Sequence, residues 1–285
     1  MALTARVPAG VGAAGFVQEY WSKKVLDAIH NFLVALPLVD HSWEPELKLG
    51  DTVNIGILNT VVAAEVVVGQ AGSALDIATG TKKQIVVNQW WEAPVVLDDM
   101  TNLQSQVNLV EKAQKEGGYA IAKKIDSTLC ALFSPLNGAS VLGTDGGAII
   151  DDVLIEAMET LDEADVPEDN RCLILDPSAK ADLLKIDKFI RTDYVREAVV
   201  PTGKFGNLYN MGIYITNNLT AVTNGTGNYG CMLHKEAIAA IVQMNSKVDR
   251  WVEPLKHQQT INTHALWGVK EMRNTFGIPI YTRKA

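Results

Sequence analysis

The chain is poor in cysteine, and what it has is widely spaced. Three cysteines occur in 285 residues, Cys130, Cys172 and Cys231. An odd number of isolated cysteines is typical of free thiols in a reducing compartment and does not fit a disulfide framework. We therefore expect synthesis in a cytoplasm.

Long apolar runs are also missing. The longest, residues 32–39, is interrupted by Pro37 and is too short to span a bilayer. The first 16 residues contain one arginine and no apolar stretch of signal-peptide length. Neither a membrane span nor an export signal is expected.

Basic residues are outnumbered. Lys and Arg total 25 against 33 Asp and Glu, which gives a formal net charge of -8. A dedicated nucleic-acid binder neutralises phosphates with clustered Lys and Arg, so this balance excludes tight binding of nucleic acid as the main task. The apolar fraction of 47% and charged fraction of 20% are those of a folded soluble protein with ample length for a core.

The sequence contains no recognisable metal-binding motif. Two acidic pairs, Asp98–Asp99 and Asp151–Asp152, could bind a divalent cation, but acids at helix starts more often interact with the helix dipole. The five histidines never approach zinc-ligand spacing, and we expect structural roles for each. They are His30, His41, His234, His257 and His264.

Catalytic motifs are absent as well. The stretch Thr202–Gly206 superficially resembles a phosphate-binding loop, yet Ala198 and Phe205 occupy the two positions that need Gly and Ser or Thr. No Gly-x-Ser-x-Gly elbow occurs, and no cysteine lies in a nucleophile setting. We therefore predict no catalytic, cofactor-binding or metal-ligating residue, and no cofactor.

The longest periodic segment runs from Asp98 to Phe133. Its apolar residues recur every three or four positions, which predicts one helix about 54 Å long with a polar opposite face that includes Asp126. The pattern has one gap, at Gly117–Gly118. A bend, a close crossing or the meeting of two shorter helices would each explain the glycines. Further helices are expected over residues 17–35, 149–164, 177–185 and 236–242.

Residues 50–97 are rich in β-branched residues and glycine, with strands expected over 60–68 and 82–96. They would form a two-stranded arm between helices. Because a lone ribbon buries too little surface, its valines need a neighbouring molecule, or else they fold back on their own domain. These valines are Val61, Val62, Val66, Val67, Val68, Val86 and Val87. Later strands are expected over 172–175, 213–216, 231–233, 247–253, 259–269 and 279–281, and alternation with helices indicates an α/β lobe.

This order of elements resembles the major capsid protein of tailed bacteriophages, with the Hong Kong 97-type fold. The resemblance covers nearly the whole chain. It is carried by the runs Tyr20–Leu26, Leu47–Ile55, Val87–Trp91, Leu97–Asp99, Arg171–Pro177 and Gly206–Leu219.

The resemblance implies an α+β fold with a long spine helix, an extended β-hairpin loop and an α/β axial lobe. The implied divisions are an N-terminal arm (1–16), a first peripheral part (17–49), the extended loop (50–97), the spine helix with peripheral residues (98–150), the axial domain (151–244) and C-terminal peripheral strands (245–285).

The resemblance also implies a non-enzymatic subunit that assembles with itself through hexamers and pentamers into an icosahedral shell around double-stranded DNA. Scaffolding, portal and decoration proteins are possible partners, and a membrane is not. The location would be the virion capsid, after synthesis in the host cytoplasm. Two alternatives remain: an encapsulin-like bacterial nanocompartment shell protein, which would enclose protein cargo, and a soluble α/β enzyme, which would form a small oligomer with a polar pocket.

Overall fold

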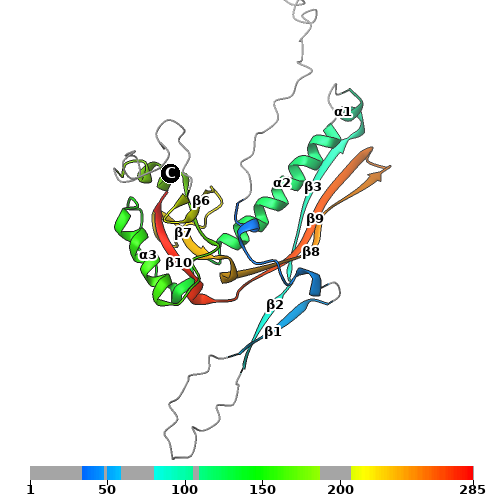
Figure 1. Ribbon diagram of the computed structural model, residues 1–285. Helices are drawn as coiled ribbons and strands as arrows, with labels where there is room; N and C mark the ends of the chain where they lie inside the picture. The colour runs from blue at the N-terminus through cyan, green and yellow to red at the C-terminus, as the bar shows by residue number, and fades with distance from the viewer. Residues whose placement is uncertain (1–33, 48–49, 59–79, 105–108, 187–206, 285) are drawn as a thin grey trace, which may run out of the picture.

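The computed structural model describes residues 34–47, 50–58, 80–104, 109–186 and 207–284. The molecule is elongated: a lobe lies at one end, a long helix on a three-stranded sheet leads to the other end, and a hairpin projects from the middle (Figure 1). Among the described residues, no helix combines the length and apolarity needed to cross a membrane.

The spine of the molecule is α2, Leu109–Cys130. It passes through Gly117 without interruption, so the alternative of two helices meeting at the glycine pair is wrong. The expected single helix over 98–133 is also too long. Asp98 ends a strand, and its carboxylate accepts the N–H of Met100 at 2.9 Å, which caps the short helix α1, Asp99–Gln104.

Gly117 marks a close crossing between α2 and the sheet beneath it. A Cβ at position 117 would lie 2.6 Å from Oγ1 of Thr263, whereas one at Gly118 would meet nothing within 4 Å. The gap in the apolar pattern is thus explained by contact, because only a residue without a side chain fits there.

The sheet under α2 contains β3 (Gln89–Asp98), β9 (Gln258–Glu271) and β8 (Ile238–Glu253), in that order and antiparallel. The short helix expected over 236–242 is wrong, because β8 begins at Ile238 after the single turn η5, Lys235–Ala237. An apolar run of this length fits a buried strand or a helix equally well, and pairing with β9 decides for the strand.

The projecting hairpin consists of β1 (Thr52–Leu58) and β2 (Gly80–Val86), paired antiparallel from Thr52 with Val86 to Leu58 with Gly80. The strand expected over 82–96 is therefore two strands in different sheets. At the break, the N–H of Val87 donates to the carbonyl of Asp51 at 2.8 Å, and the chain then changes partner from β1 to β9. The strand expected over 60–68 and the helix over 17–35 fall outside the described residues, apart from the last two positions of that helix.

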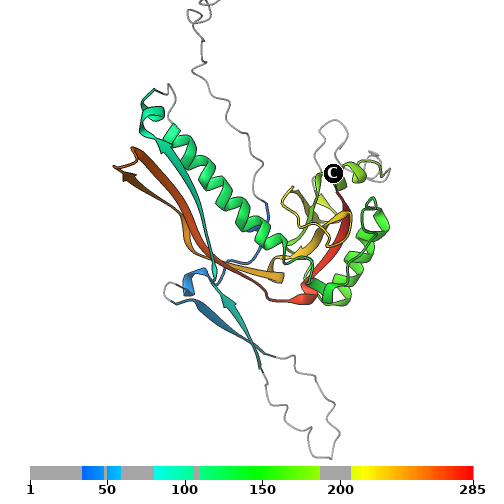
Figure 2. The ribbon, with the colours of Figure 1, turned by 180° about the vertical axis from the view of Figure 1, so that it is seen from behind.

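The lobe is built on a five-stranded sheet of order β10-β7-β4-β6-β5, in which only β4 and β6 run parallel. Helix α3 (Asp151–Glu163) lies beside β10, and α4 (Pro177–Leu183) follows β4 (Figures 1 and 2). The α/β character expected of this region is confirmed. The strands are β4 (Arg171–Leu175), β5 (Asn207–Leu208), β6 (Met211–Ile215), β7 (Gly227–His234) and β10 (Gly277–Arg283).

The last strand connects the two ends of the molecule. The resemblance implies one set of peripheral strands over residues 245–285, but β10 lies in the sheet of the lobe, while β8 and β9 lie under α2. Short 3₁₀ turns complete the chain: η2 (Leu36–Leu38), η3 (Glu44–Glu46), η4 (Leu136–Ala139) and η6 (Asn274–Phe276).

Two apolar clusters hold these parts together. The larger joins the inner face of α2 to α3 and the lobe sheet, and includes Leu129, Phe133, Leu161, Ile174 and Trp267. The smaller lies under the root of the hairpin. It consists of Leu47, Val53, Ile55, Ile85, Val87, Ala239, Ile241 and Met272.

Candidate functional site

The two faces of the hairpin differ. Ile85 and Val87 are buried in the smaller cluster, whereas Lys82, Gln84 and Val86 face away from it and are exposed. This alternation is that of a strand covered on one side. The root of the arm is therefore anchored to its own body by one face and presents the other.

Of the arm valines that the structure describes, one packs on its own domain and one remains exposed, as a contact with a neighbouring molecule would need. Val87 packs on its own domain with 6% of its surface exposed, and Val86 remains 39% exposed. The other five, from Val61 to Val68, lie outside the described residues.

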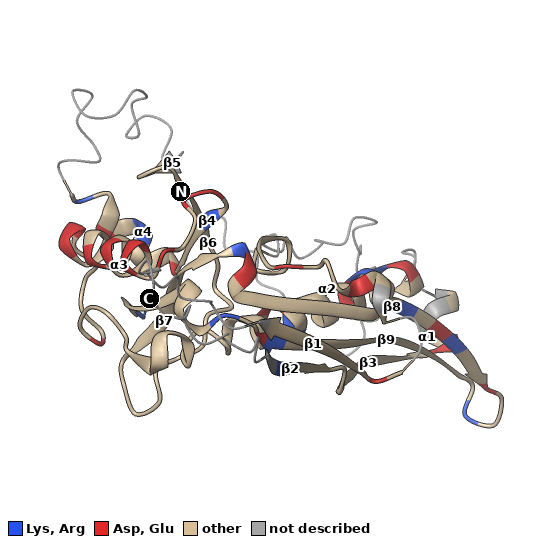
Figure 3. Cartoon of the chain, turned by 60° about the horizontal axis from the view of Figure 1, so that its bottom comes forward, with Lys and Arg blue, Asp and Glu red and all other residues tan. Residues whose placement is uncertain are grey.

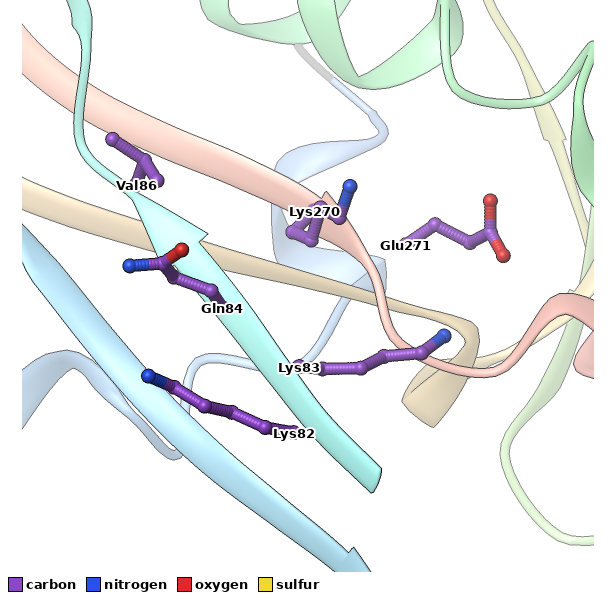
Figure 4. Close-up of a pocket in the computed structure, with 6 residues that line it drawn as sticks. All are labelled: Lys82, Lys83, Gln84, Val86, Lys270 and Glu271. Atoms are coloured by element: carbon purple, nitrogen blue, oxygen red, sulfur yellow. The ribbon is translucent and has the colours of Figure 1, made fainter.

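A groove of about 480 Å³ lies where the exposed face of β2 meets the end of β9 (Figure 4). We call it the lysine groove. Lys83 is held in place because its Nζ donates to the carbonyl of Met272 at 2.6 Å. The lining residues are Lys82, Lys83, Gln84, Val86, Lys270 and Glu271.

The exposed side of α3 is acidic. Asp152, Glu156, Glu159 and Glu163 follow one another at spacings of four, three and four, so they lie along one face of the helix. We call this row the acidic stripe; Figure 3 shows the concentration of acidic residues on α3. The helix sequence contains no Lys or Arg to offset it.

A third surface gathers at the end of the molecule opposite the lobe (Figure 2). Large apolar side chains are exposed there on β3, α1 and the β8–β9 hairpin, and exposed apolar surface of this kind marks interaction sites. The residues are Val96, Met100, Leu103, Trp251, Val252 and Leu255, and Leu255 is 98% exposed.

The histidines that the structure describes make local contacts. His41 Nε2 lies 2.6 Å from the carbonyl oxygen of Leu36, and His234 Nδ1 accepts the N–H of Glu236 while burial lowers its pKa. His257 occupies a turn with a φ of 51°, and His264 Nε2 lies 3.7 Å from Asp249. His30 falls outside the described residues. Within the described ranges, no three His, Cys, Asp or Glu side chains gather in a way that could hold a metal ion.

The acidic pairs have separate roles. Asp98 caps α1, as described above. Asp151, in the first turn of α3, accepts the hydroxyl of Tyr209 at 2.6 Å, and burial together with this hydrogen bond raises the pKa of Tyr209 to about 12. Asp152 belongs to the acidic stripe. The phosphate-loop look-alike Thr202–Gly206 lies outside the described residues.

All three cysteines are free and buried, which confirms the expectation of free thiols. Burial raises the pKa of Cys172 to about 12, and burial also raises the pKa values of Cys130 and Cys231 well above the ordinary thiol value. These thiols are protonated and apolar in character at neutral pH.

Sequence reasoning missed the role of Asp126. The expectation that it faces solvent is wrong, because Asp126 is fully buried and accepts the N–H of Ala35 at 2.7 Å and Nδ2 of Asn218 at 3.0 Å. It thereby ties the segment before η2 and the lobe to the spine. The signal was its position next to Ile125 and four residues before Cys130, at the edge of the apolar stripe.

Comparison with protein families matches residues 94–267, more than half of the chain, to the phage capsid protein family. A search of curated proteins found no match. Among solved structures, one from Mycobacterium phage Che8 is similar with a TM-score of 0.79 and 23% identity, over 93% of this chain and 97% of that one.

Two further structures are similar at lower identity. The capsid structure of the Cyanophage P-SCSP1u matches with a TM-score of 0.73 and 14% identity, over 99% of this chain and 100% of that one. The capsid of a native GTA particle matches with a TM-score of 0.72 and 10% identity, over 97% and 100%.

The expected Hong Kong 97-type fold is confirmed by these similarities, and the family match confirms the expected capsid role over the nanocompartment and enzyme alternatives. The protein is accordingly a structural component of a virion shell. The chain belongs to the phage capsid protein family, as a major capsid protein of a tailed bacteriophage.

Proposed function

We propose that this subunit assembles through hexamers and pentamers into an icosahedral shell around double-stranded DNA, with the hairpin arm of each copy lying over a neighbour. The observation that carries the proposal is the one-sided anchoring of the arm. Ile85 is fully buried against the body, while Lys82 and Val86 on the same strand are exposed. The arm also projects away from the body (Figure 1), as expected of an element that contacts another molecule.

We further propose a division of labour between the ends of the molecule. The lobe, with α3, α4 and the sheet that includes β10, would meet its copies at the centre of each ring. The apolar end, with Leu103 and Trp251, would meet neighbouring rings. The separation of these two surfaces along one elongated chain supports this arrangement.

The net charge of -8 supports a wall that encloses DNA without holding it tightly, because a negative surface repels phosphate. The proposed subunit performs no catalysis, acts in the virion and is made in the host cytoplasm. Scaffolding, portal and decoration proteins are its proposed further partners.

The role of the arm is testable by shortening it. Because Leu58 and Gly80 are paired, a two-residue Asn-Gly turn can replace residues 59–79 and close the hairpin. The shortened chain should fold, since the buried residues of β1 and β2 are retained, but should fail to form closed shells. Electron microscopy of purified particles checks this.

A matched control replaces the same residues by a flexible Gly-Ser linker of equal length. Normal shells from the Asn-Gly variant would remove the proposed role of the arm. Failure of both variants, with the wild-type chain assembling, would indicate that the side chains of the replaced segment matter and not its length alone.

A further inference from the structure

We propose that the lysine groove of one copy binds the acidic stripe on α3 of a neighbouring copy. The inference rests on the proposed function, because it takes the partner to be a second copy in the shell. It adds a specific pair of charged surfaces to the general contact of the arm with its neighbour.

The groove carries positive charge that the described part of its own chain leaves unmatched. Lys82 and Lys270 are exposed, and neither has a hydrogen bond or ion pair with another described residue. Lys83 is fixed by its bond to the Met272 carbonyl, and Glu271 is the only carboxylate among the described residues of the lining. The lining thus contains three lysines and one glutamate. Lys82 and Lys83 point to opposite sides of β2 (Figure 4), and the Gln84 amide can add a donor.

The stripe carries negative charge that the described residues of its own chain also leave unmatched. Asp152 and Glu156 are four residues apart, as are Glu159 and Glu163, and like charges at this spacing destabilise a helix. Arg171, the basic residue beside the helix, is already paired with Asp162 at 2.7 Å. A cationic partner would therefore relieve a repulsion that the separate subunit retains.

The two surfaces cannot meet within one molecule. The groove lies at the root of the hairpin and the stripe lies on the lobe, on separate parts of the chain (Figures 1 and 3). The hairpin root is anchored by the smaller cluster, in which Ile85 is fully buried, so it is not free to swing toward α3. Only two copies can bring the groove and the stripe together.

Carboxylates fit the groove better than phosphates of nucleic acid. The whole chain carries a net charge of -8, so a long anionic strand that extends beyond the groove is repelled on balance. A stripe of four carboxylates, spread over about 16 Å of helix, delivers its charge locally. Charge complementarity of this kind fixes register between partners and suppresses wrong contacts.

The test is a charge swap. The double variants Lys82→Glu/Lys270→Glu and Glu156→Lys/Glu159→Lys each place like charges opposite one another. Each should raise the subunit concentration needed for assembly by about tenfold or more at low salt, measured by light scattering. The quadruple variant, which reverses both surfaces, should recover most of the lost assembly.

The matched control for Lys82→Glu/Lys270→Glu is Lys115→Glu/Lys123→Glu, which makes the same change in net charge on exposed positions of α2, at the cost of the exposed pair between Lys115 and Glu111. Thermal melting of each variant shows whether the subunit still folds. Reversals that assemble at the wild-type concentration, or a quadruple variant no better than the worse double variant, would overturn the inference.

A second experiment tests whether the groove binds carboxylates or the phosphates of nucleic acid. If a short double-stranded DNA binds the wild-type subunit and not Lys82→Glu/Lys270→Glu, while assembly is unchanged, the groove binds phosphate and the inference is wrong. Failure of the wild-type chain itself to assemble would contradict the proposed function, whereas wild-type shells with indifferent variants would contradict only the paired surfaces.

Discussion

Gly117 is the residue at which the spine helix comes closest to the sheet beneath it. Gly117→Ala places a Cβ 2.6 Å from Oγ1 and 3.1 Å from Cβ of Thr263, both on a strand in the middle of its sheet. We expect it to lower the free energy of unfolding by about 1–3 kcal/mol, because a tightly packed site does not yield easily. Chemical denaturation of the subunit measures this.

Gly118→Ala is the matched control, since a Cβ there meets nothing within 4 Å. It should raise the free energy of unfolding by about 0.5–1 kcal/mol through helix propensity alone. Equal effects of the two substitutions would contradict the close crossing.

The three buried thiols predict a reactivity pattern. Because their pKa values are raised by burial, they carry almost no thiolate at pH 8 in the folded protein. Ellman's reagent should therefore label none of them at an appreciable rate until guanidinium unfolds the chain, and then all three. Rapid labelling of Cys130, Cys172 or Cys231 in the folded protein would contradict the burial of that thiol.

The same shifts predict an alkaline loss of stability. An unfolded thiol ionises near pH 8.5, about its ordinary value, while the folded thiols keep their protons. Above that pH the unfolded chain binds fewer protons than the folded one, so the free energy of unfolding falls as pH rises. Denaturation curves at pH 7 and pH 10 check the sign, and Cys172→Ala at both values shows how much of the difference comes from this thiol.

For single residues, the sequence predicted the chemical state of a side chain better than the contacts it makes. The free cysteines follow from their number and spacing. Asp126 was misplaced, because its carboxylate is paired by Ala35 and Asn218, which are about 90 residues away in either direction. Helical periodicity carries no information about such distant partners.

Among the elements, the hairpin is the one whose stability depends on a single face. Ile85→Ala should destabilise its root by about 2–5 kcal/mol, because Ile85 is fully buried in the smaller cluster. Val86→Ala, the neighbour on the exposed face, should stay within about 0.5 kcal/mol of wild type. Hydrogen exchange of the β1 and β2 amides distinguishes the two. Equal exchange rates in both variants would mean that the root is not anchored by this cluster.

The sequence predicted the type of an element correctly where the periodic pattern was long. Two predictions from shorter or ambiguous patterns were wrong. The spine, α3 and the lobe strands appear at the expected places. The sequence predicts a helix over residues 236–242 and one strand over 82–96, and both predictions are wrong. In both cases strand pairing determines the structure. The run from Ile238 forms strand β8 because it pairs with β9, and β2 and β3 are two strands because β2 pairs with β1 whereas β3 pairs with β9.

At the scale of the whole molecule, the chain is organised for contact on several sides. The exposed face of the arm, the lobe with its acidic stripe and the apolar end occupy different regions of an elongated body (Figures 1 and 3). The order of elements along the sequence was enough to suggest this architecture. That order did not predict that β10 joins the lobe sheet, because a strand separated from β7 by β8 and β9 can join either sheet.

The most direct measurement is electron microscopy of the purified full-length protein, with light scattering over a range of concentrations. Closed shells, or rings of five and six copies, are the expected result. A protein that stays monomeric or dimeric at high concentration, and does not assemble when a scaffolding protein is added, would contradict the proposed assembly.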